Sequence, residues 1–271
     1  MNLFDKFTSS RAFEEDVGIS SFGLAVQKPE AAGIQYDSER QSFTTRYNHL
    51  VYALGFIISR EIMEDDMYDV VGQKKAQGLA FSMRQTKEIV AANVYNRAFN
   101  SSYTFGDGVQ LCATTNVNLA GGTWANTLAV AADISEAALE QACIDISLFT
   151  NDRGLRIAVI PEMIIVPPQL DFETARILKT QGRVGTANND VNAINMMGKF
   201  KKGYVVNHYL TDPDAWFIRT NVKHGMKYFE RRADEFNMDN DFDTENAKFK
   251  ATARYSFGCT DKRGIYGSPG A

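Results

Sequence analysis

Two carboxylates stand at the kind of strand-to-helix junction that many active sites occupy. The apolar run Met163–Val166 ends at Pro167-Pro168, and Asp171 and Glu173 follow at the start of the next helical pattern. A general acid and a general base would have to converge on one substrate. Side chains two residues apart at a helix start point in different directions, whereas acids at that end complement the helix dipole. We therefore interpret these acids as helix-stabilising charges and the two prolines as a rigid turn.

The other residue types that carry chemistry are sparse and scattered. The three histidines lack the H-x-x-x-H and H-E-x-x-H spacings of a zinc site and have no convergent catalytic partners: His49, His208 and His224. The three cysteines are widely spaced, form no C-x-x-C pair and are interpreted as buried reduced thiols: Cys112, Cys143 and Cys259. Neither set predicts a nucleophile or a metal centre.

An acidic stretch and several glycine clusters resemble binding loops only in part. Asp239–Glu245 begins like a calcium loop, but Thr244 and Lys250 replace its glycine and its bidentate glutamate. We interpret it as a solvated acidic turn, with a weak cation site as the minor alternative. The glycine clusters continue into no phosphate-binding motif: Gly106-Asp107-Gly108, Gly121-Gly122 and Gly182-Arg183-Val184-Gly185. The sequence thus predicts no catalytic residue, no cofactor-binding residue, no metal ligand and no cofactor, and hence no enzyme.

Composition and charge narrow the function classes further. The chain has 271 residues, of which 44% are hydrophobic and 23% charged, enough for one large or two modest domains. No apolar run approaches the roughly 18 residues of a membrane span, and the N-terminus lacks the apolar core of a signal peptide. We expect a soluble protein that contacts no membrane and is not exported by that route. A net charge of −4 argues against a sequence-independent nucleic-acid binder, but not against a protein that encloses nucleic acid without gripping it.

The first third of the chain predicts elongated elements. Residues 1–20 are polar with scattered phenylalanines and predict an extended arm. Residues 21–48 alternate around a polar turn at Asp37-Ser38-Glu39 and predict a hairpin that projects from the body. Residues 49–59 predict a strand that returns to the body. Apolar residues recur at helical spacing through 61–99 without a proline, which predicts one helix of about 58 Å at 1.5 Å per residue.

The rest of the chain predicts a mixed domain and a tail of strands. Ile134–Phe149 is amphipathic and predicts a helix with Ser135 as its N-cap. A second helix is expected over residues 170–180, and residues 181–200 predict a long loop rich in glycine and asparagine. The tail, residues 225–271, alternates with period two and predicts antiparallel sheet.

This order of elements resembles the major capsid protein of tailed phages, an α+β architecture known as the Hong Kong-type fold. Four stretches carry the resemblance and are closest to Mu-like head subunits: "DGVQLCATTNV", "ISEAALEQA…FTNDRGLRIAVIPEMIIVPPQLDFETARIL", "VVNHYLTDPDAWFI" and "DKRGIYGSPGA". Asn116 stands where the family usually has a His-like residue. The match covers nearly the whole chain from about Ser21 onward.

The resemblance implies a division of the chain and a structural role. It implies an N-terminal arm over 1–20, an extended hairpin (E-loop) over 21–48, a peripheral domain over 49–119 and 223–271 with spine helix 61–99, and an axial domain over 120–222. Arm and E-loop would reach neighbouring subunits. Copies of the chain would assemble through hexamers and pentamers into the icosahedral head shell of a tailed bacteriophage, which encloses double-stranded DNA without sequence-specific binding.

The resemblance also implies partners and location. We expect a portal, decoration proteins and a separate scaffold protein, because no scaffolding segment fits before the arm. The protein would be made in the host bacterial cytoplasm and reside in the virion. Lys28 lies near the hairpin base, but no motif supports a covalent crosslink there. Two alternatives remain: an encapsulin-like nanocompartment that shares the fold but carries protein cargo, and an unrelated enzyme at the Asp171/Glu173 junction, for which the sequence supplies no catalytic set.

Overall fold

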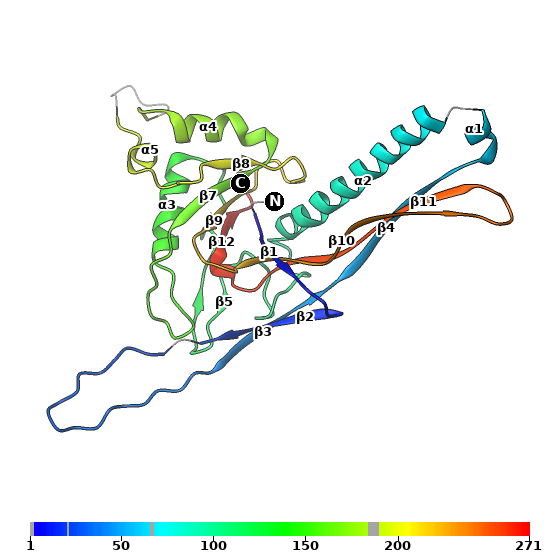
Figure 1. Ribbon diagram of the computed structural model, residues 1–271. Coiled ribbons are helices and arrows are strands. Elements are labelled where there is room, and N and C mark those ends of the chain that lie inside the picture. The colour runs from blue at the N-terminus through cyan, green and yellow to red at the C-terminus, as the bar shows by residue number, and fades with distance from the viewer. Residues whose placement is uncertain (1–2, 21, 66–67, 184–189) are drawn as a thin grey trace.

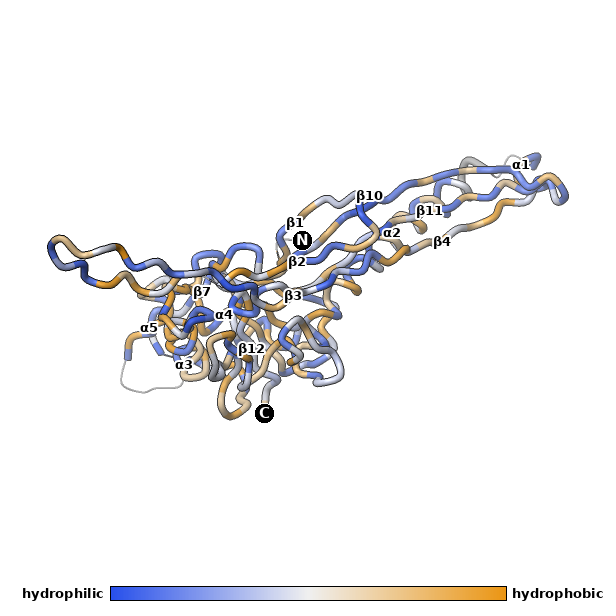
Figure 2. The backbone as a smooth tube through the Cα atoms, turned by 90° about the horizontal axis from the view of Figure 1, so that it is seen from below, coloured by the Kyte–Doolittle hydropathy of each residue, from blue (hydrophilic) through white to orange (hydrophobic). Residues whose placement is uncertain are grey.

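Two projections leave the body of the molecule in opposite directions (Figures 1 and 2). The computed structural model describes residues 3–20, 22–65, 68–183 and 190–271. One projection is an arm built from the long helix and three long strands, and the other is a loop between two short strands. The predicted α+β class is confirmed, and the elongated shape leaves much of the chain without partners in its own subunit.

A four-stranded sheet forms the arm, and we call it the peripheral sheet. Its strand order is β1-β10-β11-β4, with β1 parallel to β10 and the other pairs antiparallel. The strands are β1 (Asp5–Thr8), β4 (Leu50–Ile58), β10 (Met226–Asn240) and β11 (Ala247–Cys259). The period-two tail therefore forms the predicted antiparallel pair. β4 leads away from the body along the arm (Figure 1), so the prediction that this strand returns to the body is wrong.

The long helix is interrupted near its beginning, where the prediction of one helix over 61–99 is wrong. α1 (Arg60–Glu64) ends at Asp65, and α2 begins at Tyr68 and continues to Asn96. Asp66 and Met67 lie outside the described residues. Acidic side chains at the end of α1 face the negative end of its dipole, whereas the same run of acids favours a new helix start.

α2 also ends earlier than predicted, and it packs through one stripe. The backbone N–H of Ala98 donates to the carbonyl of Tyr95 at 2.9 Å, a tight turn that closes the helix before Phe99. The buried side chains recur every three to five residues and form one stripe, as a helix lying on a sheet requires: Leu79, Met83, Lys87, Ala92 and Tyr95. At 1.5 Å per residue the 29 residues of α2 span about 43 Å.

The hairpin that projects from the body begins earlier in the chain than predicted, and its turn lies at other residues than predicted. β2 (Phe13–Ile19) pairs antiparallel with β3 (Gln41–Asn48), so part of the predicted arm is the first hairpin strand. Between them residues 22–40, the projecting loop, extend without regular structure. The chain reverses at Pro29–Ala32, where the Ala32 N–H donates to the Pro29 carbonyl at 3.2 Å. The turn predicted at Asp37-Ser38-Glu39 is therefore wrong.

Residues 3–8 pack on the body of the molecule, whereas the sequence predicts an extended N-terminal arm over residues 1–20. Phe4 is buried in the core between α2 and the peripheral sheet, and its ring meets Tyr95 and Phe257 edge to face. β1 adds a parallel strand to β10, and Asp5 accepts from the Arg219 guanidinium at 2.7 Å. Phe4, the pairing of β1 with β10 and the Asp5–Arg219 contact together anchor this segment to the body.

A second sheet, the central sheet, lies between two hydrophobic cores. Its order is β12-β9-β7-β8, from β7 (Pro161–Val166), β8 (Tyr204–Val206), β9 (Trp216–Thr220) and β12 (Ile265–Ser268). Met163 and Ile165 face the core shared with α2, whereas Ile164 and Val166 face the core beneath the helices of the body. Burial on both faces explains why the run from Met163 to Val166 is apolar throughout. The segment 223–271, predicted as peripheral, ends with β12, and this strand belongs to the central sheet and not to the peripheral sheet.

The remaining elements cover the central sheet. α3 (Glu136–Ser147) begins at Ser135, whose hydroxyl accepts from the Ala138 N–H at 3.2 Å, as predicted. The two prolines start a short 3-10 turn, Pro168–Leu170, that leads into α4 (Asp171–Lys179). The long loop holds α5 (Ala193–Met197), while residues 184–189, including part of one glycine cluster, lie outside the described residues. β5 (Asn116–Val117) and β6 (Thr123–Trp124) form a small separate ladder.

Candidate assembly surfaces

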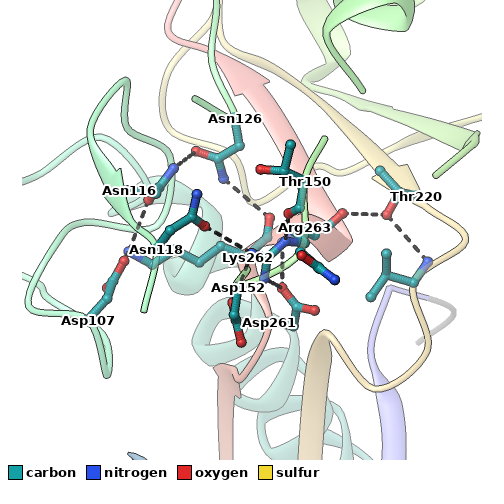
Figure 3. A network of polar contacts seen from close by, with 12 residues as sticks. Asp107, Asn116, Asn118, Asn126, Thr150, Asp152, Thr220, Asp261, Lys262 and Arg263 are labelled. Carbon is teal, nitrogen blue, oxygen red and sulfur yellow. Dashed lines mark hydrogen bonds and ion pairs between the residues drawn. The ribbon is translucent and has the colours of Figure 1, made fainter. Parts of the chain in front are cut away.

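A buried polar network, which we call the junction network, surrounds the turn between β11 and β12, and Lys262 is its centre (Figure 3). Its ammonium group donates to Asp107 Oδ2 at 2.8 Å and to the carbonyls of Val109 and Gln110 at 2.9 and 2.7 Å. Asn116 Oδ1 lies 3.3 Å away as a further acceptor. Burial lowers the pKa of Lys262, and the Asp107 carboxylate opposes that shift. A lysine surrounded in this way is held as a fixed cation.

Two asparagines extend the network around Lys262. The Asn116 amide donates to Asn126 Oδ1 at 2.8 Å, and Asn126 in turn donates to the carbonyl of Leu111 at 2.9 Å. Asn126 also accepts from the Ala113 N–H at 2.9 Å. These bonds tie the segment 107–126 to itself and, through longer contacts of Asn126 with the carbonyls of Lys262 and Ile265, to the end of the chain.

Arg263 binds the other side of the same junction. Its guanidinium donates to the Thr150 carbonyl at 2.6 Å and to Asp152 Oδ1 at 2.9 Å, and it lies over the ring of Trp124. Thr220, at the end of β9, donates its hydroxyl to the Arg263 carbonyl at 2.6 Å. The two adjacent basic residues therefore tie the turn between β11 and β12 to the segments 107–126 and 150–152.

The predicted junction after β7 is built as a support. Tyr204 donates its hydroxyl to Asp171 Oδ1 at 2.8 Å, while Glu173 is exposed on α4. The two carboxylates therefore have different surroundings and do not converge. The Asp171 contact joins the start of α4 to β8, which holds the helix on the sheet.

The histidines and cysteines form no common site among the described residues, although Cys112 and Cys259 belong to the same hydrophobic core. His49 is buried against Ser256, whereas His224 is exposed beside Asp5. All three cysteines are free and buried, as predicted; burial raises the pKa of Cys143 to about 11 and also raises those of Cys112 and Cys259. Within the described ranges no group of three or more His, Cys, Asp or Glu side chains is arranged to hold a metal ion.

The projecting loop exposes a row of large apolar side chains. Leu24 is 78% exposed and Tyr36 91%, and their neighbours in the two limbs are exposed as well: Phe22, Val26 and Ile34. Figure 2 shows apolar positions alternating with polar ones along the loop. A loop of this kind cannot bury enough area against itself to offset its conformational entropy. A neighbouring molecule is the natural cover for it.

β4 is an edge strand of the peripheral sheet, so one of its edges is unpaired. Leu50, Val51 and Ile57 are exposed along it, whereas Tyr52 and Phe56 pack against the core shared with α2. Unpaired, apolar strand edges associate with other chains unless they are covered. The arm therefore offers a second surface suited to another subunit.

The body offers an apolar groove between α3 and α5. It has a volume of about 390 Å³ and is lined mainly by Cys143, Ile144, Leu148, Ile194 and Met197. Phe172 on α4 and Met196 on α5 are exposed nearby in the same layer of helices. No helix among the described residues is long and apolar enough to cross a membrane.

Comparison with known proteins identifies a family. A model of the family described as phage capsid protein matches residues 42–268. This range contains the central sheet, the peripheral sheet apart from β1, all the helices of the described residues and the residues bonded to Lys262 and Arg263. No curated protein matches the sequence.

Solved structures share the fold at low sequence identity. The capsid of an empty GTA particle matches with a TM-score of 0.59 at 13% identity, covering 98% of this chain and 87% of that one. The capsid of Myoviridae phage XM1 matches with 0.56 at 6%, covering 97% and 89%. The virus-like particle from Pyrococcus furiosus matches with 0.54 at 12%, covering 98% and 90%. All three adopt the predicted Hong Kong-type fold, whereas the closer relationship to Mu-like subunits stays a prediction.

Sequence reasoning found the segments of the network but not their contacts. The stretches around Asp107 and Lys262 carried the family resemblance, yet 155 positions separate these residues. Lys262-Arg263 beside an apolar strand was the available signal, because adjacent basic residues are rarely buried unless they are paired.

Proposed function

The chain belongs to the phage capsid protein family, and we propose that it builds the icosahedral head shell of a tailed bacteriophage around double-stranded DNA. The family is structural, so the proposed role is assembly without catalysis. The observation that carries the proposal is the projecting loop, which exposes Leu24 and Tyr36 and has no strand partner beyond Ile19 and Gln41. Such a loop is unfavourable in an isolated subunit and favourable only when neighbours cover it.

The proposed shell uses three surfaces of each subunit. The projecting loop lies on the arm of a neighbouring copy, where the open strand β4 supplies apolar side chains and an unpaired edge. The body gathers around the five- and six-fold centres of pentamers and hexamers through the helices that line the α3–α5 groove. The division into E-loop, peripheral domain and axial domain follows these three contacts. A subunit bound in this way buries an interface well above the standard size.

The proposed contents and partners follow from charge and from the family. A chain with a net charge of −4 suits an inner wall that does not adhere to packaged DNA. We infer a separate scaffold protein during assembly, a portal at one vertex and decoration proteins on the outside. The protein would be made in the host bacterial cytoplasm and end in the virion.

Electron microscopy of the concentrated full-length protein tests the assembly. We expect closed shells, tubes or rings, with and without the co-expressed proteins of the same gene cluster. A matched variant replaces Leu24 and Tyr36 by Ser, which removes the exposed apolar contacts and leaves the core residues untouched. That variant is expected to remain a folded subunit. A wild-type chain that stays monomeric at every concentration and with every co-expressed protein would contradict the proposal.

A protein-filled compartment is the second candidate. The similarity to the virus-like particle from Pyrococcus furiosus favours it, because the same fold then encloses something other than a phage genome. The contents of purified particles decide between the two. Nuclease-protected double-stranded DNA supports the phage head, and a stoichiometric protein cargo without DNA supports the compartment.

A further inference from the structure

Asp37 and Arg153 join the projecting loop to the body. Arg153 donates from Nη1 to Asp37 Oδ2 at 2.7 Å and from Nη2 to the Ser38 carbonyl at 2.5 Å. The same Asp37 oxygen accepts from the Gly23 N–H at 2.8 Å, and Asp37 Oδ1 accepts from the Ser38 N–H at 2.8 Å. One carboxylate therefore links both limbs of the loop, and one guanidinium holds that carboxylate to the body.

Gly23 allows the limbs to come this close. A Cβ at that position would lie 3.3 Å from Asp37 Oδ2 and 3.4 Å from Arg153 Nη1, tighter than side chains normally pack. The backbone N–H can approach the carboxylate because no side chain stands between them. The three residues form one fitted contact, which we call the clasp.

The turn that carries Arg153 also belongs to the junction network. Asn151 Oδ1 accepts from the N–H groups of Arg153 and Leu155, and Gly154 completes the turn at a φ of 78°. Asp152, the residue before Arg153, accepts from the guanidinium of Arg263 at 2.9 Å. In this turn Arg153 binds the projecting loop and its neighbour Asp152 binds Arg263. The loop is therefore attached to the folded body of the molecule.

We propose that the clasp of Gly23, Asp37 and Arg153 is a positioning device that sets the direction of the projecting loop before a neighbouring subunit binds it. The role in assembly rests on the proposed function, whereas the positioning itself is a property of the single chain. From the clasp to the reversal at Pro29–Ala32 each limb spans about 20 Å, and a rotation of about 10° at the base moves the tip by about 3.5 Å, most of the ~4.8 Å between paired strands. A loop without its clasp would therefore often present its apolar row out of register.

Distance measurements on the unassembled full-length chain test the positioning directly. Spin labels on Glu30→Cys at the loop tip and Glu173→Cys on α4 would occupy exposed sites, and the native cysteines are buried. We expect one narrow distance distribution, whose width at least doubles in Asp37→Ala and in Arg153→Ala. Glu39→Ala, which removes an exposed acid of the same limb, is the matched control and leaves the width unchanged. Equal widths in all four chains, or equal broadening by Glu39→Ala, would overturn the clasp.

Assembly kinetics test its consequence. If the unclasped loop points correctly about a tenth of the time, the apparent affinity between subunits falls roughly tenfold. We expect Asp37→Ala and Arg153→Ala to slow shell formation by about that factor, with urea midpoints equal to those of the wild type and Arg153→Lys in between. Broad loop distributions with wild-type assembly rates would overturn the positioning role. If the wild-type chain forms no shells, the proposed function fails, and the distance distributions still judge the clasp.

Discussion

Lys262 and Arg263 are charges buried where the molecule could have used apolar residues. A buried ion pair is often no more stabilising than a well-packed apolar pair, because both charges lose their hydration. These pairs instead contribute geometric specificity. Lys262 donates to Asp107 and to several carbonyls, and Arg263 donates to the Thr150 carbonyl and to Asp152. A single arrangement satisfies all of these acceptors together. The residues thus specify how the segments 107–126 and 150–152 pack around the turn between β11 and β12.

Removing Lys262 is expected to be costly because its partner stays behind. Lys262→Met would leave the buried Asp107 carboxylate without a counter-charge, a loss of about 3–5 kcal/mol in the free energy of unfolding. Urea titration of unassembled subunits measures it. Lys201→Met, at an exposed lysine, is the control and should change stability by less than about 0.5 kcal/mol. The double variant Lys262→Met/Asp107→Leu should recover much of the loss; equal stability of Lys262→Met and wild type would contradict the proposed importance of the pair.

The cysteines give a prediction about reactivity. Burial raises the pKa of Cys143 to about 11, so at pH 8 its thiolate fraction is roughly a hundredfold below that of free cysteine. The pKa values of Cys112 and Cys259 are also raised by burial. We expect all three thiols to react slowly with an aromatic disulfide reagent in native subunits and rapidly after urea unfolding. A thiol that reacts at the free rate before unfolding would contradict its burial.

Among the elements, those defined by local periodicity could be predicted from the sequence. The strand Pro161–Val166, the capped helix Glu136–Ser147 and the pair β10–β11 follow from patterns within a few residues. The hairpin turn was misplaced because Asp37 and Ser38 look like turn residues. The Asp37 carboxylate instead accepts from the guanidinium of Arg153, 116 positions away. Such a contact leaves no trace in local spacing.

The predictions for the long helix and for the N-terminal arm were wrong for related reasons. Helical spacing continues through the acids after Glu64, but periodicity does not report the electrostatic cost of acids at a helix end. Phe4 was read as part of a polar arm because its buried partners, Tyr95 and Phe257, come from distant segments. The junction network could not be predicted for the same reason, because its residues are far apart in the sequence and only the fold brings them together.

The strand-to-helix element after Pro167-Pro168 can be tested by three variants. Val166→Asp would bury an unpaired carboxylate in the core beneath α3, at a cost of about 4 kcal/mol or more. Asp171→Ala should cost about 1–2 kcal/mol, because it loses both the bond from Tyr204 and the dipole interaction. Glu173→Ala, exposed on the same helix, should cost only about 0.3–1 kcal/mol. Urea unfolding ranks the three, and intact shells from Val166→Asp would mean that this core has been misassigned.

At the scale of the whole molecule, some parts of the chain belong to the hydrophobic cores and others lie outside them. The central sheet belongs to both hydrophobic cores, because alternate residues of β7 face opposite sides. The two cores therefore move as one body, to which β1 is anchored through Phe4. The projecting loop lies outside both cores, and β4 keeps an unpaired edge with exposed apolar side chains such as Val51 and Ile57. Assembly is expected to order the second group and to leave the first unchanged.

Amide hydrogen exchange distinguishes these two groups. Residues 24–36 lie beyond the clasp without a strand partner, so their amides should exchange rapidly in unassembled subunits. In shells, a neighbouring subunit should cover the row around Leu24 and Tyr36 and slow exchange there by at least about tenfold. β1 is the internal control, because Asp5–Thr8 already pair with β10 and should be equally protected in both states. Loop amides that are protected in free subunits would mean that the loop folds on its own chain. Loop amides that stay fast in shells would mean that no neighbour covers them, and the loop would then have no part in holding the shell together.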